Sequence, residues 1–114
     1  MTNEEKDLQV FSVTQEDKDT LVQLSEVLFE TTAGAFKACV TLALEKNLEP
    51  QNFSNGLTQS SSATIDDLVE FLKWYCDTKT PVRLANGLGH AGAKYVKAEL
   101  EKGREPQDIF FGLN

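Results

Sequence analysis

The residues Gly87-Leu88-Gly89-His90-Ala91-Gly92 spell G-x-G-x-x-G, a pattern with which many proteins bind the pyrophosphate of a dinucleotide. In those proteins the glycines lie between a buried parallel strand and a helix, and an acidic residue ends the next strand. Here the preceding residues 81–86 are too short and too polar for a central strand, and too few residues follow for another strand-helix unit. We therefore expect no nucleotide cofactor and interpret the glycines as packing positions that let another helix approach closely.

Other side chains capable of chemistry are few and far apart. His90 is the single histidine, and Cys39 and Cys76 are separated by a predicted loop and parts of two helices. No metal-ligand spacing exists among them, so we expect no metal site. We expect both cysteines to be small apolar residues of the helices and His90 to lie at or near the surface, without a catalytic partner.

Three acidic residues, Asp66, Asp67 and Glu70, gather at the start of a predicted helix. Carboxylates are common at this position because they interact favourably with the positive end of the helix dipole. An enzyme would need titratable groups that converge in a pocket, and no such set is visible. The sequence therefore predicts a protein that is not an enzyme, with no catalytic residues and no cofactor.

The charge of the chain is unevenly distributed. Its 114 residues carry a net charge of −7, to which residues 1–30 contribute −6, whereas residues 81–114 sum to +1. Binding to nucleic acid depends on clustered Lys and Arg, so the acidic first part disfavours it. The acidic start lacks the apolar region of a signal peptide, and no apolar run is long enough to cross a membrane. We expect a cytoplasmic protein without a membrane partner.

The pattern of apolar residues predicts an all-α fold, a compact single domain of about four amphipathic helices with a short N-terminal strand over residues 8–13. Residues 1–7 are expected to be flexible, and residues 8–114 to form the helical domain. The helices are predicted over residues 15–30, 33–47, 65–77 and 81–102, the last with a break at Asn86-Gly87. A loop rich in Ser, Asn and Gln, predicted to be mobile, occupies residues 48–63.

The third predicted helix has more apolar residues than one buried face needs. Ile65, Leu68, Leu72, Tyr75 and Cys76 suffice for its inner face, which leaves Phe71 and Trp74 as a surplus. The tail ends in Ile109-Phe110-Phe111, which must dock on some other surface to stay out of water. We expect Phe71, Trp74, Phe110 and Phe111 to contribute to an interaction surface, either in a homodimer or with a protein partner.

Residues 8–47 resemble a ribbon-helix-helix DNA-binding unit. The matching features are the β-prone residues 8–13, a helix with Leu21 and Leu24, the Thr31-Thr32 cap, and a second helix with Phe36, Val40 and Ala43. The resemblance implies a dimer in which two strands pair across the interface and read the major groove. Only Gln9 and Ser12 would be available for that role here.

A second resemblance covers more of the chain. "LFETTAGAFKACVTLALEKNLEP" (28–50), "DTKTP" (77–81) and "AGAKYVKAEL" (91–100) are similar in order and spacing to a small helical accessory protein of bacterial DNA phosphorothioation gene clusters. The matching residues carry no chemistry, and the resemblance implies an accessory role in DNA modification or phage defence. The sequence thus predicts a non-catalytic interaction protein, and the resemblance associates it with DNA modification, phage defence or mobile elements. The alternative is a dimeric ribbon-helix-helix-like DNA-binding regulator.

Overall fold

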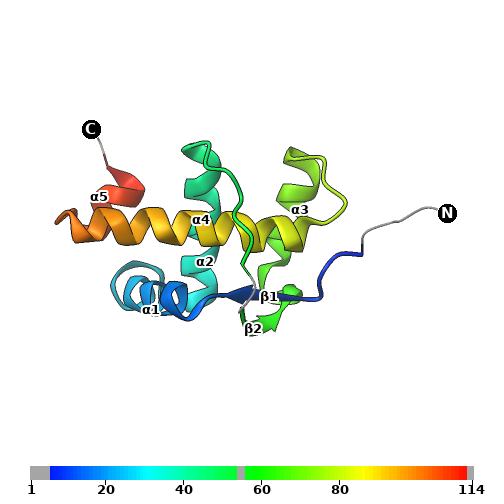
Figure 1. The fold of residues 1–114 in the computed structure, drawn as a ribbon, viewed down its shortest axis with the longest axis horizontal. Helices are drawn as coiled ribbons and strands as arrows, with labels where there is room; N and C mark the ends of the chain where they lie inside the picture. The colour runs from blue at the N-terminus through cyan, green and yellow to red at the C-terminus, as the bar shows by residue number, and fades with distance from the viewer. Residues whose placement is uncertain (1–5, 54–55, 113–114) are drawn as a thin grey trace.

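The computed structural model describes residues 6–53 and 56–112, and its longest element is the helix α4 (Pro81–Glu101). α4 runs across the molecule, and α2 (Thr32–Glu45) crosses it (Figure 1). The predicted break at Asn86-Gly87 does not occur, because both residues lie inside the continuous helix and are buried. Contacts with the neighbouring elements thus override the low intrinsic helix propensity of glycine, which is about 1 kcal/mol below that of alanine.

The contact between α2 and α4 is close because two glycines of α4 face α2. A Cβ atom added to Gly89 would collide with the ring of Phe36, and one added to Gly92 would collide with the backbone carbonyl of Cys39. Phe36, Cys39 and Val40 are fully buried at this crossing. The interpretation of the glycines as positions of close helix approach is therefore confirmed.

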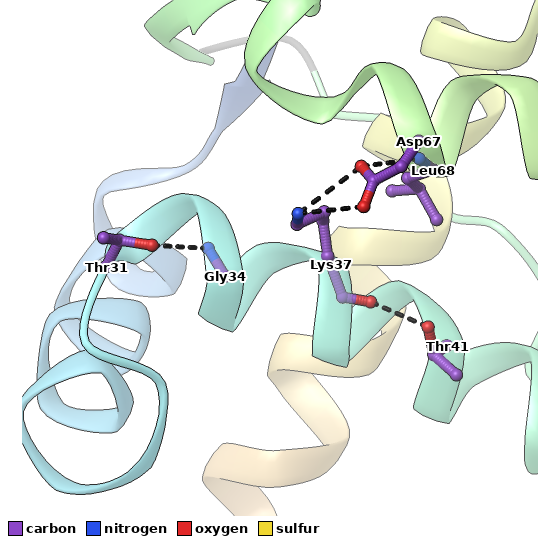
Figure 2. A network of polar contacts seen from close by, with 6 residues as sticks. All are labelled: Thr31, Gly34, Lys37, Thr41, Asp67 and Leu68. Carbon is purple, nitrogen blue, oxygen red and sulfur yellow. Dashed lines mark hydrogen bonds and ion pairs between the residues drawn. The ribbon is translucent and has the colours of Figure 1, made fainter.

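The first helical region has two parts. α1 (Gln15–Leu24) begins at Thr14, whose hydroxyl accepts a hydrogen bond from the backbone N–H of Asp17 at 3.1 Å. It continues as one π-helical turn, η1 (Ser25–Phe29), which the sequence pattern did not predict, and ends at Glu30 with a φ of 65°. Thr31 then caps α2 by accepting a hydrogen bond from the N–H of Gly34 (Figure 2).

A small two-stranded antiparallel sheet lies beside the helices. β1 (Val10–Val13) confirms the predicted N-terminal strand, and it pairs with β2 (Leu57–Ser61), with Val10 opposite Ser61 and Val13 opposite Leu57. The prediction of a loop over residues 48–63 is wrong from residue 57 onward, where β2 is followed by a 3-10 turn, η2 (Ser62–Ile65). The polar sequence of β2 carries no strand pattern, so its extended conformation depends on pairing with β1.

Helix α3 (Asp66–Tyr75) packs against α4 through Leu68 and Leu72, which are buried. Tyr75 was predicted on the inner face, and this is wrong, since 61% of the residue is exposed. Tyr75 is the last residue of the helix, and its ring stacks on that of Phe71 at 5.1 Å instead of entering the core.

The segment before β1 is anchored to α4. The carboxylate of Asp7 accepts hydrogen bonds from the backbone N–H groups of Val82 and Arg83, at 2.8 and 2.9 Å. It therefore caps the N-terminus of α4, where the side chain of Thr80 makes no capping bond. Residues 1–7 were predicted to be flexible, and this prediction is wrong for Asp7, which these hydrogen bonds anchor. Residues 1–5 lie outside the described part of the chain.

The C-terminal tail folds back by means of a short helix, α5 (Pro106–Phe111), that buries Ile109 and that the sequence pattern did not predict. Arg104 connects α5 to α4, because its guanidinium donates to the carboxylate of Glu99 at 2.8 Å and to the carbonyl of Asp108 at 2.9 Å. Figure 1 shows α3 and α5 near opposite ends of α4, with α2 between them.

Within the described ranges, no single helix is long and apolar enough to cross a membrane. Gln15–Phe29 and Thr32–Glu45 meet the requirement of length and composition only as a pair, and that pair is bent by 97°.

The α2–α4 crossing predicts that Gly92→Ala destabilises the protein by about 3 kcal/mol, at the upper end of the cost of overpacking. The added methyl group would meet a backbone carbonyl, which cannot move aside like the end of a flexible side chain. Urea unfolding measures the effect. The control Ala98→Gly, at an exposed position of the same helix, gives the helix-propensity contribution of about 1 kcal/mol. A Gly92→Ala variant as stable as the wild type would contradict the packing argument.

Candidate functional site

The G-x-G-x-x-G residues do not form a loop. Residues 87–92 lie in the middle of α4, where the backbone N–H groups donate to carbonyl groups of the preceding turn. A phosphate-binding loop instead directs free N–H groups at its ligand. The geometry of this segment is therefore that of a packed helix and not of a nucleotide site.

His90 makes an ion-pair contact that the sequence analysis missed. Its Nδ1 lies 2.6 Å from Oδ2 of Asp17, and the side chains are 15% and 4% exposed, respectively. The ring of Phe53 covers the imidazole at a centroid distance of 5.1 Å, which holds the 51–53 segment against α4. The expectation that His90 has no partner is thus wrong, since α1 supplies one from 73 residues away.

An Asp–His pair can orient an imidazole for proton transfer, so the surrounding groups decide its use. Cys39 lies close enough to feel the charge of Asp17, but its burial, together with that charge, raises the pKa of the thiol to about 12. The thiol is therefore protonated at neutral pH and is a poor nucleophile. Cys39 is a core residue, as predicted, and we interpret Asp17–His90 as a buried tie between α1 and α4.

The three acidic residues at the start of α3 do not meet His90. Asp67 forms an ion pair with Lys37 of α2 at 3.2 Å, and the hydrogen bond from Lys37 lowers the pKa of the Asp67 carboxyl below its usual value (Figure 2). Glu70 contacts Lys73 at 3.9 Å, and Asp66 is exposed. In the described part of the chain, no group of three His, Cys, Asp or Glu side chains is arranged to hold a metal ion.

β1 pairs with β2 of the same chain, and the backbone N–H of Ser12 donates to Oδ1 of Asn86 in α4 at 3.0 Å. A ribbon-helix-helix dimer needs the corresponding strand to pair with that of a second chain. This arrangement gives no support to the alternative of a DNA-binding regulator.

A cavity of about 220 Å³ lies between β1, residues 51–53, Gly56 and α4. Its lining is mixed, with Leu8 and Phe53 beside the polar groups of Ser12, Arg83 and Asn86. Ser12 and Asn86 already bond to each other, and the guanidinium of Arg83 donates to the carbonyl of Lys6. The polar groups of this cavity therefore connect segments of the chain.

Three exposed aromatic residues lie together on α3, and we call this surface the aromatic face. It consists of Phe71, Trp74 and Tyr75, which are 42%, 79% and 61% exposed and whose rings contact one another. Two of the four predicted surface residues, Phe71 and Trp74, belong to it. The sequence analysis missed Tyr75, although its spacing of four residues from Phe71 indicates a shared helix face.

The other two predicted surface residues lie on α5. Phe111 is 62% exposed, whereas Phe110 is half-buried because its ring packs edge-on against Phe29 at 5.0 Å. These residues and Phe29 line a groove of about 190 Å³ along α2, which we call the α2–α5 groove. Ala38 and Thr41 of α2 also line it.

A second groove, of about 370 Å³, runs between α2 and α3, and we call it the α2–α3 groove. It shares Ala38 and Thr41 with the α2–α5 groove, so the two are neighbours along α2. Its lining is Lys37, Ala38, Thr41, Asp67, Leu68 and Phe71. Figure 2 shows Lys37 reaching from α2 to Asp67 of α3, so an ion pair joins the two helices at this groove. The predicted surface residues are therefore connected by an apolar surface along α2.

Comparison with protein-family models, with curated proteins and with solved structures finds no match to this chain.

The buried pair predicts that Asp17→Ala destabilises the protein by about 3 kcal/mol, because removing the carboxylate leaves the buried Nδ1 of His90 without its hydrogen-bond partner. Thermal or urea unfolding measures the loss. Glu16→Ala is the matched control: Glu16 forms a surface ion pair with Lys97 at 3.3 Å and should change stability by no more than about 1 kcal/mol. Equal effects of the two substitutions would show that the Asp17–His90 contact contributes nothing special.

The raised pKa of Cys39 predicts slow alkylation of that thiol at pH 8 in the folded protein. Deprotonation requires a pH near 12, and burial blocks access as well. Mass spectrometry after iodoacetamide treatment of Cys76→Ser, in which Cys39 is the remaining thiol, measures the rate. We expect modification to accelerate by orders of magnitude when urea unfolds the chain. Rapid modification under native conditions would contradict the buried position of Cys39.

Proposed function

We propose that this chain is a non-catalytic interaction protein that binds a protein partner, which is either a second copy or a different chain, through the aromatic face of α3 and the adjoining grooves along α2. The observation that carries this proposal is the exposure of three contacting aromatic rings on one helix. Trp and Tyr are enriched among the residues that dominate the energy of protein interfaces.

The surroundings of the aromatic face support the same proposal. Contiguous exposed apolar patches are uncommon on monomeric proteins and usually mark a binding surface. The α2–α3 groove lies next to this face, with Phe71 contributing to both, so a projecting group and a depression occur side by side. The charged rim formed by Lys37, Asp67, Glu70 and Lys73 has the polar character expected around the apolar centre of an interface.

The chemistry of the interior supports a role in binding over a role in catalysis. The Asp17–His90 pair and Cys39 are buried within helix contacts, and the acidic residues of α3 are exposed and partly paired with lysines. The resemblance to an accessory protein of DNA phosphorothioation clusters suggests which partners to test first, namely proteins of bacterial DNA modification, phage defence or mobile elements. We propose that the chain acts in the cytoplasm.

Site-specific photo-crosslinking in living cells tests the proposal. A photoreactive benzoylphenylalanine at position 74, in place of Trp74, should give one dominant protein adduct of defined mass, identified by mass spectrometry. The matched control carries the same group in place of Val22, which is also exposed and apolar but lies on α1. The same adducts from both positions, or none from position 74, would contradict an interaction through the aromatic face.

A further inference from the structure

Trp74 projects beside a groove on the same surface. It is the most exposed of the large apolar residues in the described ranges, and its ring lies 6.5 Å from that of Phe71. Phe71 in turn lines the α2–α3 groove. A projecting ring and an apolar depression are thus adjacent on one helix, although the ring does not line its own groove.

This pairing of projection and groove is self-complementary under two-fold symmetry. When two α3 helices pack antiparallel about an axis between residues 72 and 73, Trp74 of each copy faces Phe71 of the other. Each indole then reaches the groove of the opposite copy, and both contacts form at once. Such isologous contacts are the commonest way in which identical chains associate.

The order of charges along α3 favours the antiparallel arrangement. Asp66, Asp67 and Glu70 lie at the start of the helix and sum to −3, whereas Lys73 near its end and Asp77 and Lys79 after it sum to +1. Antiparallel packing brings the acidic start of one helix to the basic end of the other, whereas parallel packing would bring like charges together. Opposite charges at the rim fix the register of an interface more than they strengthen it.

The exposed aromatic area supplies about half of what a standard dimer interface buries. At roughly 200 Å² per aromatic side chain, the exposed fractions of Phe71, Trp74 and Tyr75 leave about 400 Å² of surface per copy. A standard interface buries about 800 Å² per partner. The floor of the α2–α3 groove and the charged rim of α3 supply additional area.

We infer that two copies of this chain form an isologous dimer in which the α3 helices pack antiparallel and Trp74 of each copy fills the α2–α3 groove of the other. This inference rests on the proposed function and specifies its partner. It also assigns separate roles to two regions, because Trp74 is the inserted group and Ala38, Thr41 and Leu68 form the receiving groove.

The fluorescence of Trp74 tests the dimer directly, since it is the only tryptophan of the chain. In the dimer the indole leaves water, so its emission should shift to the blue as the protein concentration rises, in parallel with a dimer seen by sedimentation velocity. An unshifted emission with a pure monomer at tens of micromolar would overturn the inference. If position 74 then still crosslinks to a different protein, the proposed function stands and only the identity of the partner is wrong.

Two complementary variants test the exchange of Trp74. Trp74→Ala removes the inserted group and keeps the groove, whereas Thr41→Phe fills the groove and keeps Trp74. Each variant alone should dimerise at least tenfold more weakly than the wild type. Mixing them allows Trp74 of the Thr41→Phe chain to enter the open groove of the Trp74→Ala chain, which restores one of the two contacts.

In the mixture, tryptophan fluorescence reports on one chain alone, because only the Thr41→Phe chain contains a tryptophan. Titration with Trp74→Ala should shift its emission to the blue and yield a heterodimer by sedimentation. Circular dichroism and thermal unfolding verify that both variants fold, and Val22→Ala serves as the control with unchanged dimerisation. The inference is overturned if the wild type dimerises but the two folded variants stay monomeric on mixing and their emission does not shift. The dimer contact would then lie on another surface.

Discussion

The structure depends on the close approach of α2 and α4, which is possible only because Gly89 and Gly92 have no side chains. Phe36 and the backbone at Cys39 fill the space that side chains on α4 would otherwise occupy. Well-packed interiors of this kind have the density of organic crystals and tolerate little change in volume. The other helices, the sheet and the surface grooves take their positions around this crossing.

α4 also collects the polar contacts of the N-terminal part of the chain. Asp7 caps the first turn of α4. On the next turn, Asn86 accepts a hydrogen bond from the backbone N–H of Ser12, and on the turn after that His90 pairs with Asp17. These acceptors and donors lie on successive turns of one helix. The segment from residue 7 to α1 is therefore fixed along α4 by hydrogen bonds as well as by the apolar contacts of Phe11 and Leu21.

The central position of α4 explains which residues form the exposed apolar surface. α4 buries one face of α3, through Leu68 and Leu72, and the other face of α3 is left to carry the aromatic residues. On α2 the residues toward α4 are buried, while Ala38 and Thr41 remain at the surface as the floor of both grooves. Because α4 buries one side of each neighbouring helix, the other sides leave an apolar strip that runs from α3 to α5.

Local patterns predicted the features that local forces determine. The spacing of Leu21 and Leu24, the Thr31-Thr32 cap and the small residues of α4 indicated three of the long helices and the role of the glycines. Phe71, Trp74 and Phe111 were predicted at the surface because the helices held more apolar residues than one face requires, and all three are exposed. Phe110 is half-buried, since Phe29, held in the unpredicted π-helical turn, packs against it.

The predictions that failed concern features that are determined by contacts between residues far apart in the sequence. The strand β2 exists through pairing with β1, and no pattern within its own five residues indicates it. The continuity of α4 at Asn86-Gly87 reflects burial under other elements, which overrides propensity. The His90–Asp17 pair escaped notice because no local pattern joins positions 73 residues apart.

The cap that Asp7 provides has a consequence for how the protein acquires its structure. The hydrogen bonds to Ser12, Val82, Arg83 and His90 each span 73 to 76 residues. Helical proteins dominated by local contacts fold fastest, and rates fall as the mean sequence separation of contacts increases. During synthesis Asp7 emerges before the helix that it caps, and these hydrogen bonds can form only after α4 has been made. Despite its helical content, the chain thus has native contacts that form only when two parts far apart in the sequence meet.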